Sequence, residues 1–379
     1  MKKNIIYLKT AIILLLIFCR INNTHGQIIM PPELMHHDRI SINPQDKNKL
    51  SFQWNSLNFL KNNEYFGDIV AGYTLVGFWA NPNFSYTFSD NFQVKAGLHL
   101  LKYSGKDDFS ESTPFFRAHY QKNNFHIVMG NIFSTVNHNL AAPVFDPERY
   151  MRNYNESGLQ LILDKYKFKA QTWINWEQFI LHGDRFPEIF TYGFSSEYRP
   201  FITKRGFQMS IPLQALFIHR GGQIDSSDVS VQTTMNLAPG LKLSKNFSFF
   251  NKKVKIGAEG FYLSYSNPKD TLFSVGSGIY TGAFAYWNKL KFSCYYWQAH
   301  DFVSPRGNLL YSSLSEKGPE KSISERQLLS LKVIYQYKIF DGVDLDFRAE
   351  PFYDLHQKNL DYSFSLMIRL NKNFFIHKI

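Results

Sequence analysis

The sequence is poor in the features that define several common protein classes. Only 2 of its 379 residues are cysteines, which excludes a disulfide framework and a thiolate metal cluster. Charged residues make up 19%, against roughly 25% in an ordinary soluble domain. Aromatic residues reach 17%, so a disordered or linker protein is excluded. The longest apolar run, residues 11–18, is too short for a transmembrane helix of roughly 20 residues. An aromatic-rich β protein remains.

The N-terminus has the three-part plan of a secretory signal. Three lysines precede the apolar run, and a polar segment with small residues follows it. We expect residues 1–26 to be a cleaved signal peptide and residues 27–49 to be a periplasmic extension. Cleavage removes four of the 42 basic residues and none of the 31 acidic ones, which leaves 38 − 31 = +7. This mild excess forms no long run, so it gives no reason to expect a nucleic-acid partner.

From Leu50 onward, apolar and polar residues alternate with the period of two that a β-strand requires. The alternation is clearest in residues 343–353 and 360–370. Strands in globular proteins cluster near about 5 or 6 residues, whereas a tilted strand that crosses a membrane needs about 9 to 11. The longer segments of this chain therefore favour membrane-spanning strands.

Short and long connections alternate along the chain, as they do in outer-membrane barrels with tight periplasmic turns and long external loops. We predict an all-β fold: a single transmembrane antiparallel up-and-down β-barrel over residues 50–379, with about 16 strands, 14 or 18 being possible. The expected strands are 50–60, 72–88, 92–104, 113–120, 124–133, 157–164, 168–178, 189–199, 207–219, 229–244, 253–265, 275–287, 291–299, 328–339, 343–353 and 360–370.

If the barrel closes, one face of each strand is turned to lipid and the other to the lumen. An unpaired backbone amide or carbonyl costs several kcal/mol in hydrocarbon, so only a closed barrel lets strands cross a membrane. The apolar set then faces lipid and the polar set faces the lumen. The expected pore-lining residues are Lys95, Arg117, Lys169, Glu177, Glu259, Lys332, Asp344, Asp346, Arg348, Glu350 and Arg369.

Two segments resemble known barrel proteins. Residues 361–376 look like the closing strand of outer-membrane β-barrel proteins of Gram-negative bacteria, porins among them, although this chain ends on Ile379 and not on an aromatic residue. The stretch 173–179, with Glu188 and Phe190 after it, is similar to uncharacterised barrel proteins of the Bacteroides type. The resemblance implies location in the cell outer membrane, contact with outer-membrane lipid, and insertion by the barrel-assembly machinery.

Passive diffusion of small hydrophilic solutes is the function expected of a barrel this wide, because about 16 strands leave an aqueous channel. The long loop 134–156 lies in the first half of the chain and could fold inward to narrow that channel. Its candidate constriction residues are His138, Asp146, Glu148, Arg149 and Arg152. Charges of both signs leave the ion selectivity open, and the solute and the oligomeric state stay open too.

Two other functions were weighed. A non-conducting barrel could act as a surface receptor or adhesin through long loops such as 300–327. A hydrolase at the rim could use Asp344 or Asp346 with the His300–Asp301 pair to activate water. No nucleophile elbow, zinc motif or phosphate loop is present in the sequence, so we expect no enzyme, no catalytic residues, no cofactor and no metal.

Overall fold

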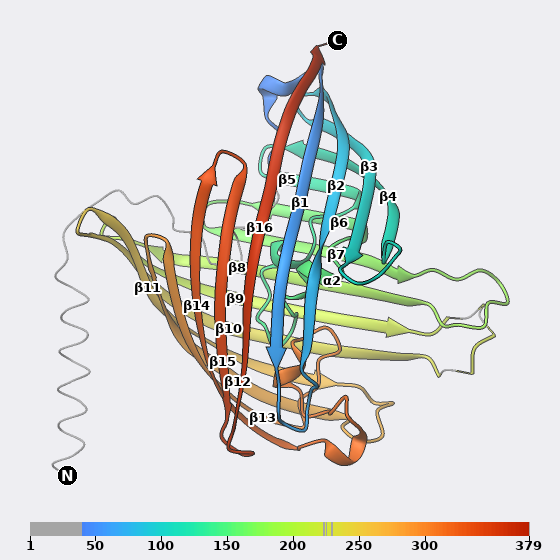
Figure 1. Ribbon diagram of the computed structural model, residues 1–379, viewed down its shortest axis with the longest axis vertical. Helices are drawn as coiled ribbons and strands as arrows, with labels where there is room; N and C mark the ends of the chain where they lie inside the picture. The colour runs from blue at the N-terminus through green and yellow to red at the C-terminus, as the bar shows by residue number, and fades with distance from the viewer. Residues whose placement is uncertain (1–39, 223, 225, 229, 379) are drawn as a thin grey trace.

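The computed structural model describes residues 40–378 except positions 223, 225 and 229, and shows a closed barrel of sixteen strands (Figure 1). The expected signal peptide and residues 27–39 of the expected extension lie outside the described residues. The strands are β1 (Lys49–Glu64), β2 (Tyr73–Ser89), β3 (Phe92–Tyr103), β4 (Glu111–Lys122), β5 (Phe125–Asn131), β6 (Ser157–Asp164), β7 (Phe168–Gln178), β8 (Ile189–Ile202), β9 (Phe207–Arg220), β10 (Gln232–Phe249), β11 (Lys252–Ser266), β12 (Val275–Trp287), β13 (Leu290–His300), β14 (Glu325–Phe340), β15 (Val343–Asp354) and β16 (Asn359–Lys378).

The helices are short. They are η2 (Pro44–Asp46), η3 (Thr135–His138), α2 (Arg149–Arg152), η4 (Leu309–Tyr311) and η5 (Pro319–Lys321). Among the described residues no helix has the length and apolar character needed to cross a membrane.

Each strand pairs antiparallel with the next one in the chain, and β16 closes the barrel against β1. The predicted up-and-down barrel of 16 strands is confirmed, and the predicted bounds of β6, β7 and β12 coincide with those observed. The largest difference is at β16, which runs to Lys378. It continues because β1 starts at Lys49, so that Trp54 pairs with Lys372 and Lys49 with Lys378.

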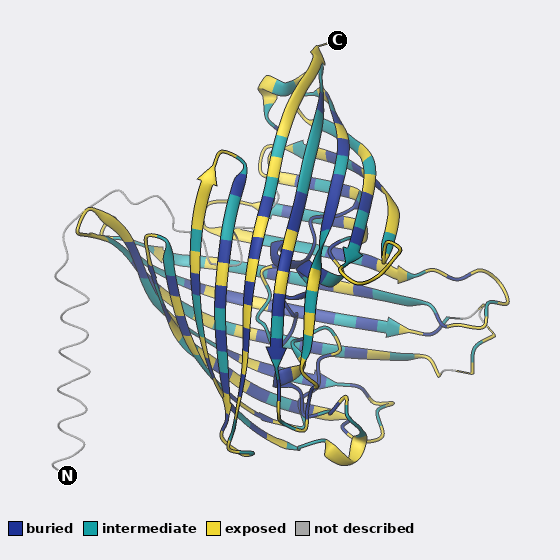
Figure 2. Ribbon diagram, in the orientation of Figure 1, coloured by how far each residue is buried: buried dark blue, intermediate teal, exposed yellow. Residues whose placement is uncertain are grey.

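The two faces of the strands alternate as a membrane barrel requires, which Figure 2 shows as alternating exposed and buried bands. In β16 the large apolar residues from Tyr362 to Ile368 are 39–44% exposed. The residues between them, from Asp361 to Arg369, are all 4% exposed or less, although they include a carboxylate and a guanidinium. Apolar side chains therefore cover the outside, and polar side chains turn inward.

The two ends of the barrel differ. At one end, tight turns join the strands, and asparagines occupy left-handed positions in several of them: Asn123, Asn251 and Asn288 have φ between 54° and 56°. Asparagine tolerates this conformation better than most other residues, so these turns are locally encoded. The long loops all lie at the other end, which by analogy with membrane barrels faces outward.

Two of the long loops fold into the barrel and pack on each other. The loop between β5 and β6, residues 132–156, is joined to the loop between β13 and β14, residues 301–324. Ser304 Oγ donates to the Val144 carbonyl at 2.9 Å, and the Asp146 amide donates to the Arg306 carbonyl at 2.7 Å. Their apolar side chains form one buried cluster that includes Phe133, Val144, Phe145, Phe302, Val303 and Leu310.

Tryptophans on the inner wall hold these loops in place. Trp79 on β2 donates its indole N–H to the Tyr150 carbonyl at 2.9 Å, and Trp297 on β13 donates to the Tyr311 carbonyl at 3.0 Å. Both indoles are 0% exposed. A large inward aromatic therefore anchors each loop inside the barrel by burial and by one hydrogen bond.

Candidate functional site

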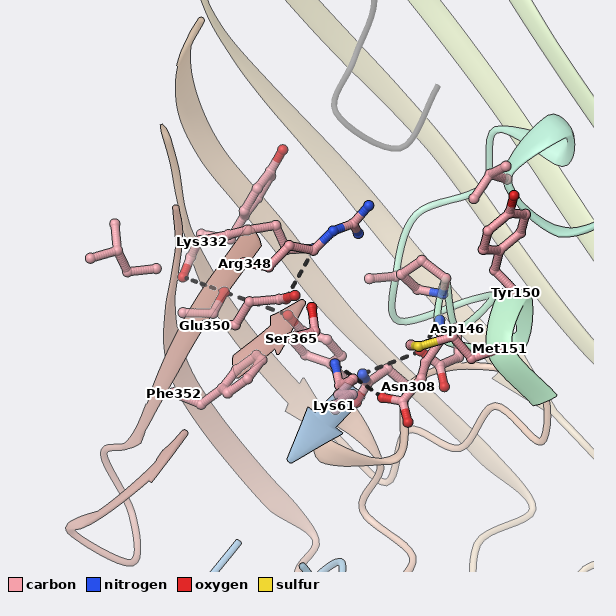
Figure 3. Close-up of a pocket in the computed structure, with 18 of the residues that line it drawn as sticks. Lys61, Asp146, Tyr150, Met151, Asn308, Lys332, Arg348, Glu350, Phe352 and Ser365 are labelled. Carbon is pink, nitrogen blue, oxygen red and sulfur yellow. Dashed lines mark hydrogen bonds and ion pairs between the residues drawn. The ribbon is translucent and has the colours of Figure 1, made fainter. Parts of the chain in front are cut away.

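A band of ion pairs lines the lumen beside loop 132–156 (Figure 3). Lys332 Nζ lies 3.1 Å from a Glu350 oxygen, and Arg348 Nε lies 2.7 Å from an Asp346 oxygen. From β1, which follows β14, β15 and β16 around the same part of the wall, Lys61 Nζ reaches a Glu148 oxygen of the loop at 3.1 Å. All of these groups except Asp346 border a cavity of about 50 Å³. The band thus ties the loop to β1 and leaves little free space.

The loop carboxylates sit close together and away from water. Glu148 also accepts a hydrogen bond from the Tyr73 hydroxyl, and Arg152 lies 3.3 Å from Asp146 and 3.8 Å from Glu148. Burial, and next the negative charge of Glu148, raise the pKa of Asp146 above its ordinary value. The pair is held by two cations, Lys61 and Arg152, that come from the wall and from the loop itself.

A second buried pair lies at the start of the same loop. His138 Nε2 is 2.8 Å from a Glu156 oxygen, and their side chains are 0% and 3% exposed. Burial acts to raise the pKa of Glu156, but contact with His138 outweighs it and lowers that pKa below the ordinary value. Ser195 of β8 donates to the His138 carbonyl at 2.7 Å. The pair is enclosed on all sides and fastens the loop to the wall.

The residues expected to line a pore occupy inward positions, but they differ in exposure. Arg117, Asp346, Arg348, Glu350 and Arg369 are between 1% and 8% exposed. Lys95, Glu259, Lys332 and Asp344 are partly buried, and Lys169 is exposed, with its Nζ 2.6 Å from Asp164. Glu177 is held by Arg306 of loop 301–324 at 2.6 Å. Their role in passage stays a prediction.

The constriction candidates come together inside the barrel. His138, Asp146 and Glu148 are buried, and Arg149 and Arg152 are partly buried.

The residues considered for a hydrolase at the rim do not come together. Asp344 and Asp346 follow the tight turn before β15, whereas His300 ends β13 at the long-loop end, where it lies 3.1 Å from Asp301. Those aspartates and that histidine are at opposite ends of the barrel, so they form no common site.

Several charged residues of the lumen are missing from the set predicted from the sequence. Lys61 lies one residue beyond the expected end of the first strand, and Arg326 lies two residues before the expected start of segment 328–339. Arg326 contacts Asp354 at 2.6 Å with both side chains 2% exposed, and Lys242 contacts Glu259 at 2.7 Å. Extending the period of two past the apolar ends of these strands would have placed Lys61 and Arg326 on the inner face.

A row of polar and aromatic side chains crosses four strands on the outer face, next to the long loops. Trp176 of β7 is opposite Phe190 of β8, Phe190 is opposite His219 of β9, and His219 is opposite Thr233 of β10. The Phe190 and His219 rings stack with centroids 4.8 Å apart. His219 Nδ1 lies 3.0 Å from Thr233 Oγ1. We call these four residues the outer row; it places an imidazole against a hydroxyl on the surface turned to lipid.

A family model described as Lipid A 3'-O-deacylase-type matches residues 42–379, which is nearly the whole described chain. The chain belongs to this family. With the closed barrel, this makes it an outer-membrane β-barrel protein located in the outer membrane. No functionally curated protein matches the sequence.

Membership in the Lipid A 3'-O-deacylase-type family overturns one expectation. The sequence was expected not to encode an enzyme, and that expectation is wrong because the family is named for an enzymatic activity. The error has a physical cause. A reactive site on a barrel can draw its members from different strands, which meet only through strand pairing and so form no local motif.

Solved structures share the fold of this deacylase-type chain. The outer membrane protein OprD from Pseudomonas aeruginosa is 10% identical with a TM-score of 0.50, covering 90% of this chain and 98% of that one. A loop L8 deletion mutant of OmpT, an outer membrane protein of Vibrio cholerae, is also 10% identical with a TM-score of 0.50, covering 85% and 99%. These likenesses concern the barrel architecture alone.

Proposed function

We propose that this protein is an outer-membrane ester hydrolase that removes an acyl chain from lipid A, with His219 and Thr233 as the reacting pair. The family name supplies the substrate class. The observation that carries the proposal is the contact of 3.0 Å between His219 Nδ1 and Thr233 Oγ1 on the outer face. A hydroxyl within hydrogen-bond reach of an imidazole is the arrangement that activates a nucleophile.

The location of the pair suits a lipid substrate. Thr233 is exposed and His219 is partly exposed. Both lie within two residues of the loop between β9 and β10, on the side of the long external loops, and so at the level of the outer leaflet. Trp176, 41% exposed and bonded to Glu188 at 2.9 Å, continues the row as an interfacial aromatic beside it. An acyl ester of a lipid in the bilayer could reach the pair sideways without entering the lumen.

The chemistry that this pair can support is acyl transfer in two steps. Thr233 Oγ1 attacks the ester carbonyl carbon while its proton passes to His219, and His219 then protonates the departing sugar oxygen as the ester bond breaks. Water next attacks the acyl-threonine, gives a proton to His219 and releases the fatty acid, and the threonine oxygen takes the proton back. One water is consumed for each ester cleaved.

The experiment measures fatty-acid release from lipid A in liposomes that contain the full-length protein, with mass spectrometry of the lipid product. We expect loss of one ester-linked acyl chain, and a fall in rate of about 10²–10⁴-fold for His219→Gln. Thr233→Val should lose activity, whereas Thr233→Ser keeps the hydroxyl and should retain much of it.

The matched control is Thr281→Val, because Thr281 is also an exposed threonine in a strand but bonds only to the Glu259 carbonyl, at 3.2 Å. Its activity should equal that of the wild type. Full activity of both His219→Gln and Thr233→Val would exclude this pair. A wild-type protein that leaves lipid A intact would exclude the deacylation itself.

A second function, passage of small hydrophilic solutes, is favoured by the lumen. Charges of both signs border the cavity of about 50 Å³ and a neighbouring one of about 130 Å³, and loop 132–156 lines both. Planar-bilayer recordings test it. Trp79→Ala removes the indole that bonds the Tyr150 carbonyl, so it should raise the conductance; absence of conductance in both proteins would reject passage.

A further inference from the structure

A polar side chain, Asn58, lies near the middle of the stretch of β1 that faces the membrane. On the outer face of β1, Trp54 is opposite Lys372 of β16, and Glu64 at the long-loop end is opposite Tyr362. Tryptophan, tyrosine and lysine are typical anchors at membrane interfaces, so these two pairs bracket the stretch. They are 64 − 54 = 10 positions apart, which is about the length of a strand that crosses a membrane.

The surroundings of Asn58 are apolar. Asn58 is exposed, whereas its neighbours Leu57 and Phe59 point inward and are 0% and 3% exposed. On the outer face it is opposite Ile368 of β16 on one side and Phe78 of β2 on the other. Figure 1 shows β1 running beside β16 along the wall of the barrel. The amide of Asn58 therefore faces hydrocarbon, where a polar group without a hydrogen bond costs free energy.

Other polar side chains on the outer face have hydrogen-bond partners within the chain. Thr172 and Thr281 donate to carbonyls of the neighbouring strands at 3.0 and 3.2 Å. Gln298, an exposed amide two positions from the end of β13, accepts from the Tyr296 hydroxyl at 3.3 Å. The side chain of Asn58 has no such partner among the described residues. Its two donors and its acceptor are thus available to a group that approaches through the membrane.

We propose that two copies of this barrel associate through the outer face of β1, with the Nδ2 of each Asn58 donating to the Oδ1 of the other. A primary amide both donates and accepts, so it is complementary to itself. A twofold axis along the membrane normal keeps the two barrels in the same orientation and brings their Asn58 residues together at the same depth. A second copy therefore satisfies both amides at once, in an environment without competing water.

The residues beside the amide suit close packing of two barrels. Toward the tight turns, Ser56 and Ala80 are opposite each other and only 5% and 4% exposed, because these short side chains lie lower than their larger neighbours. Toward the long loops, Leu60 is opposite Val76 and Leu366, and these three are 37–44% exposed. Small and large apolar rows on the two sides of the amide allow the facing barrels to interdigitate.

This interface lies away from the proposed reacting pair. His219 is on β9, which is eight strands from β1 in either direction around the barrel. Association through β1 leaves the outer row of each copy open to lipid. The inference therefore goes beyond lipid deacylation and does not depend on it.

The first test is sedimentation equilibrium of the full-length barrel in density-matched detergent. We expect the wild type to exchange between monomer and dimer, and Asn58→Leu to raise the dissociation constant about tenfold, as loss of side-chain hydrogen bonds within a membrane does. Asn58→Gln keeps the amide and should stay closer to the wild type. Gln298→Leu is the matched control, because it removes an exposed outward amide that bonds within its own chain, and its dissociation constant should not change.

The second test locates the contact by cross-linking in liposomes with a short bismaleimide, in a background of Cys19→Ser and Cys294→Ser. Asn58→Cys should give a cross-linked dimer. Leu213→Cys should not, because Leu213 is 44% exposed on the outer face of β9, on the other side of the barrel. Should Asn58→Leu fail to fold, as judged by heat-modifiable gel mobility, this cross-link decides the question. A monomeric wild type, a dimer unaffected by Asn58→Leu, or cross-linking at Leu213→Cys equal to that at Asn58→Cys would overturn the proposal.

Discussion

His138 of the inward loop lies flat against Trp173 of β7, with ring centroids 3.7 Å apart and planes 3° from parallel. His138 also contacts Glu156, at the other end of the same loop, at 2.8 Å. One imidazole thus fixes both ends of loop 132–156 against the wall. The loop also meets Lys61 and Trp79, so this stack is one of several contacts that hold the loop inside the barrel.

We predict that the barrel loses stability in acid through Glu156. The folded-state pKa of Glu156 lies below its ordinary value of 4.5, so its stabilising contribution is present above pH 4.5 and is lost as the pH falls through the folded-state pKa. Glu156→Gln should remove this part of the pH dependence and cost about 1.5–3 kcal/mol at pH 7. Urea unfolding in liposomes, followed at pH 7 and pH 3, measures both effects. An unchanged pH profile in the variant would contradict the assignment.

The stack on Trp173 predicts a strict requirement for glycine at position 193. Gly193 is opposite Trp173, and a Cβ added there would lie 2.1 Å from the indole ring. Gly193→Ala should therefore displace Trp173 and cost about 1–3 kcal/mol by overpacking. Tryptophan fluorescence and urea unfolding report the two effects.

Gly260→Ala is the control for that substitution. A Cβ at Gly260 would meet only the Thr281 side chain, at 3.3 Å or more, so this variant should unfold close to the wild-type midpoint. Equal midpoints for Gly193→Ala and Gly260→Ala would show that the indole can shift without cost.

The buried pair of Arg326 and Asp354 predicts a strong effect of removing one partner. Arg326 contacts Asp354 at 2.6 Å and donates to the Leu310 carbonyl of loop 301–324 at 2.8 Å. Arg326→Met leaves the carboxylate of Asp354 buried without its cation, which should cost about 3–5 kcal/mol. Limited proteolysis should show faster cleavage within loop 301–324.

The double variant Arg326→Met with Asp354→Asn tests the same pair from the other side. It removes both charges and keeps an oxygen for the His356 and Gln357 amides, which Asp354 caps at 2.9 and 2.8 Å. It should therefore be more stable than Arg326→Met alone. A double variant less stable than the single one would mean that the charge on Asp354 is not the source of the cost.

The architecture could be predicted well because its signals are local. Segments 168–178 and 275–287 were bounded correctly by their alternation and by the turn residues beside them, such as Asn288. Which side chains point outward and which point inward could be predicted for the same reason, since a period of two fixes which side chains share a face. The contact between His219 and Thr233, on which the proposed activity rests, could not be found in this way, because the two residues are 14 positions apart and meet only through strand pairing.

By itself, the sequence determined a closed membrane barrel with an apolar outer face and a polar inner face. It could do so because strand period, strand length and turn residues each depend on only a few neighbouring positions. Only the tertiary structure decided which inward groups meet. Lys61 finds Glu148 and Gln53 finds Asn373 through the closure of β1 on β16 and the folding of loop 132–156 into the lumen. Those contacts depend on register and loop packing between residues as many as about 320 positions apart in the chain, and no local pattern encodes them.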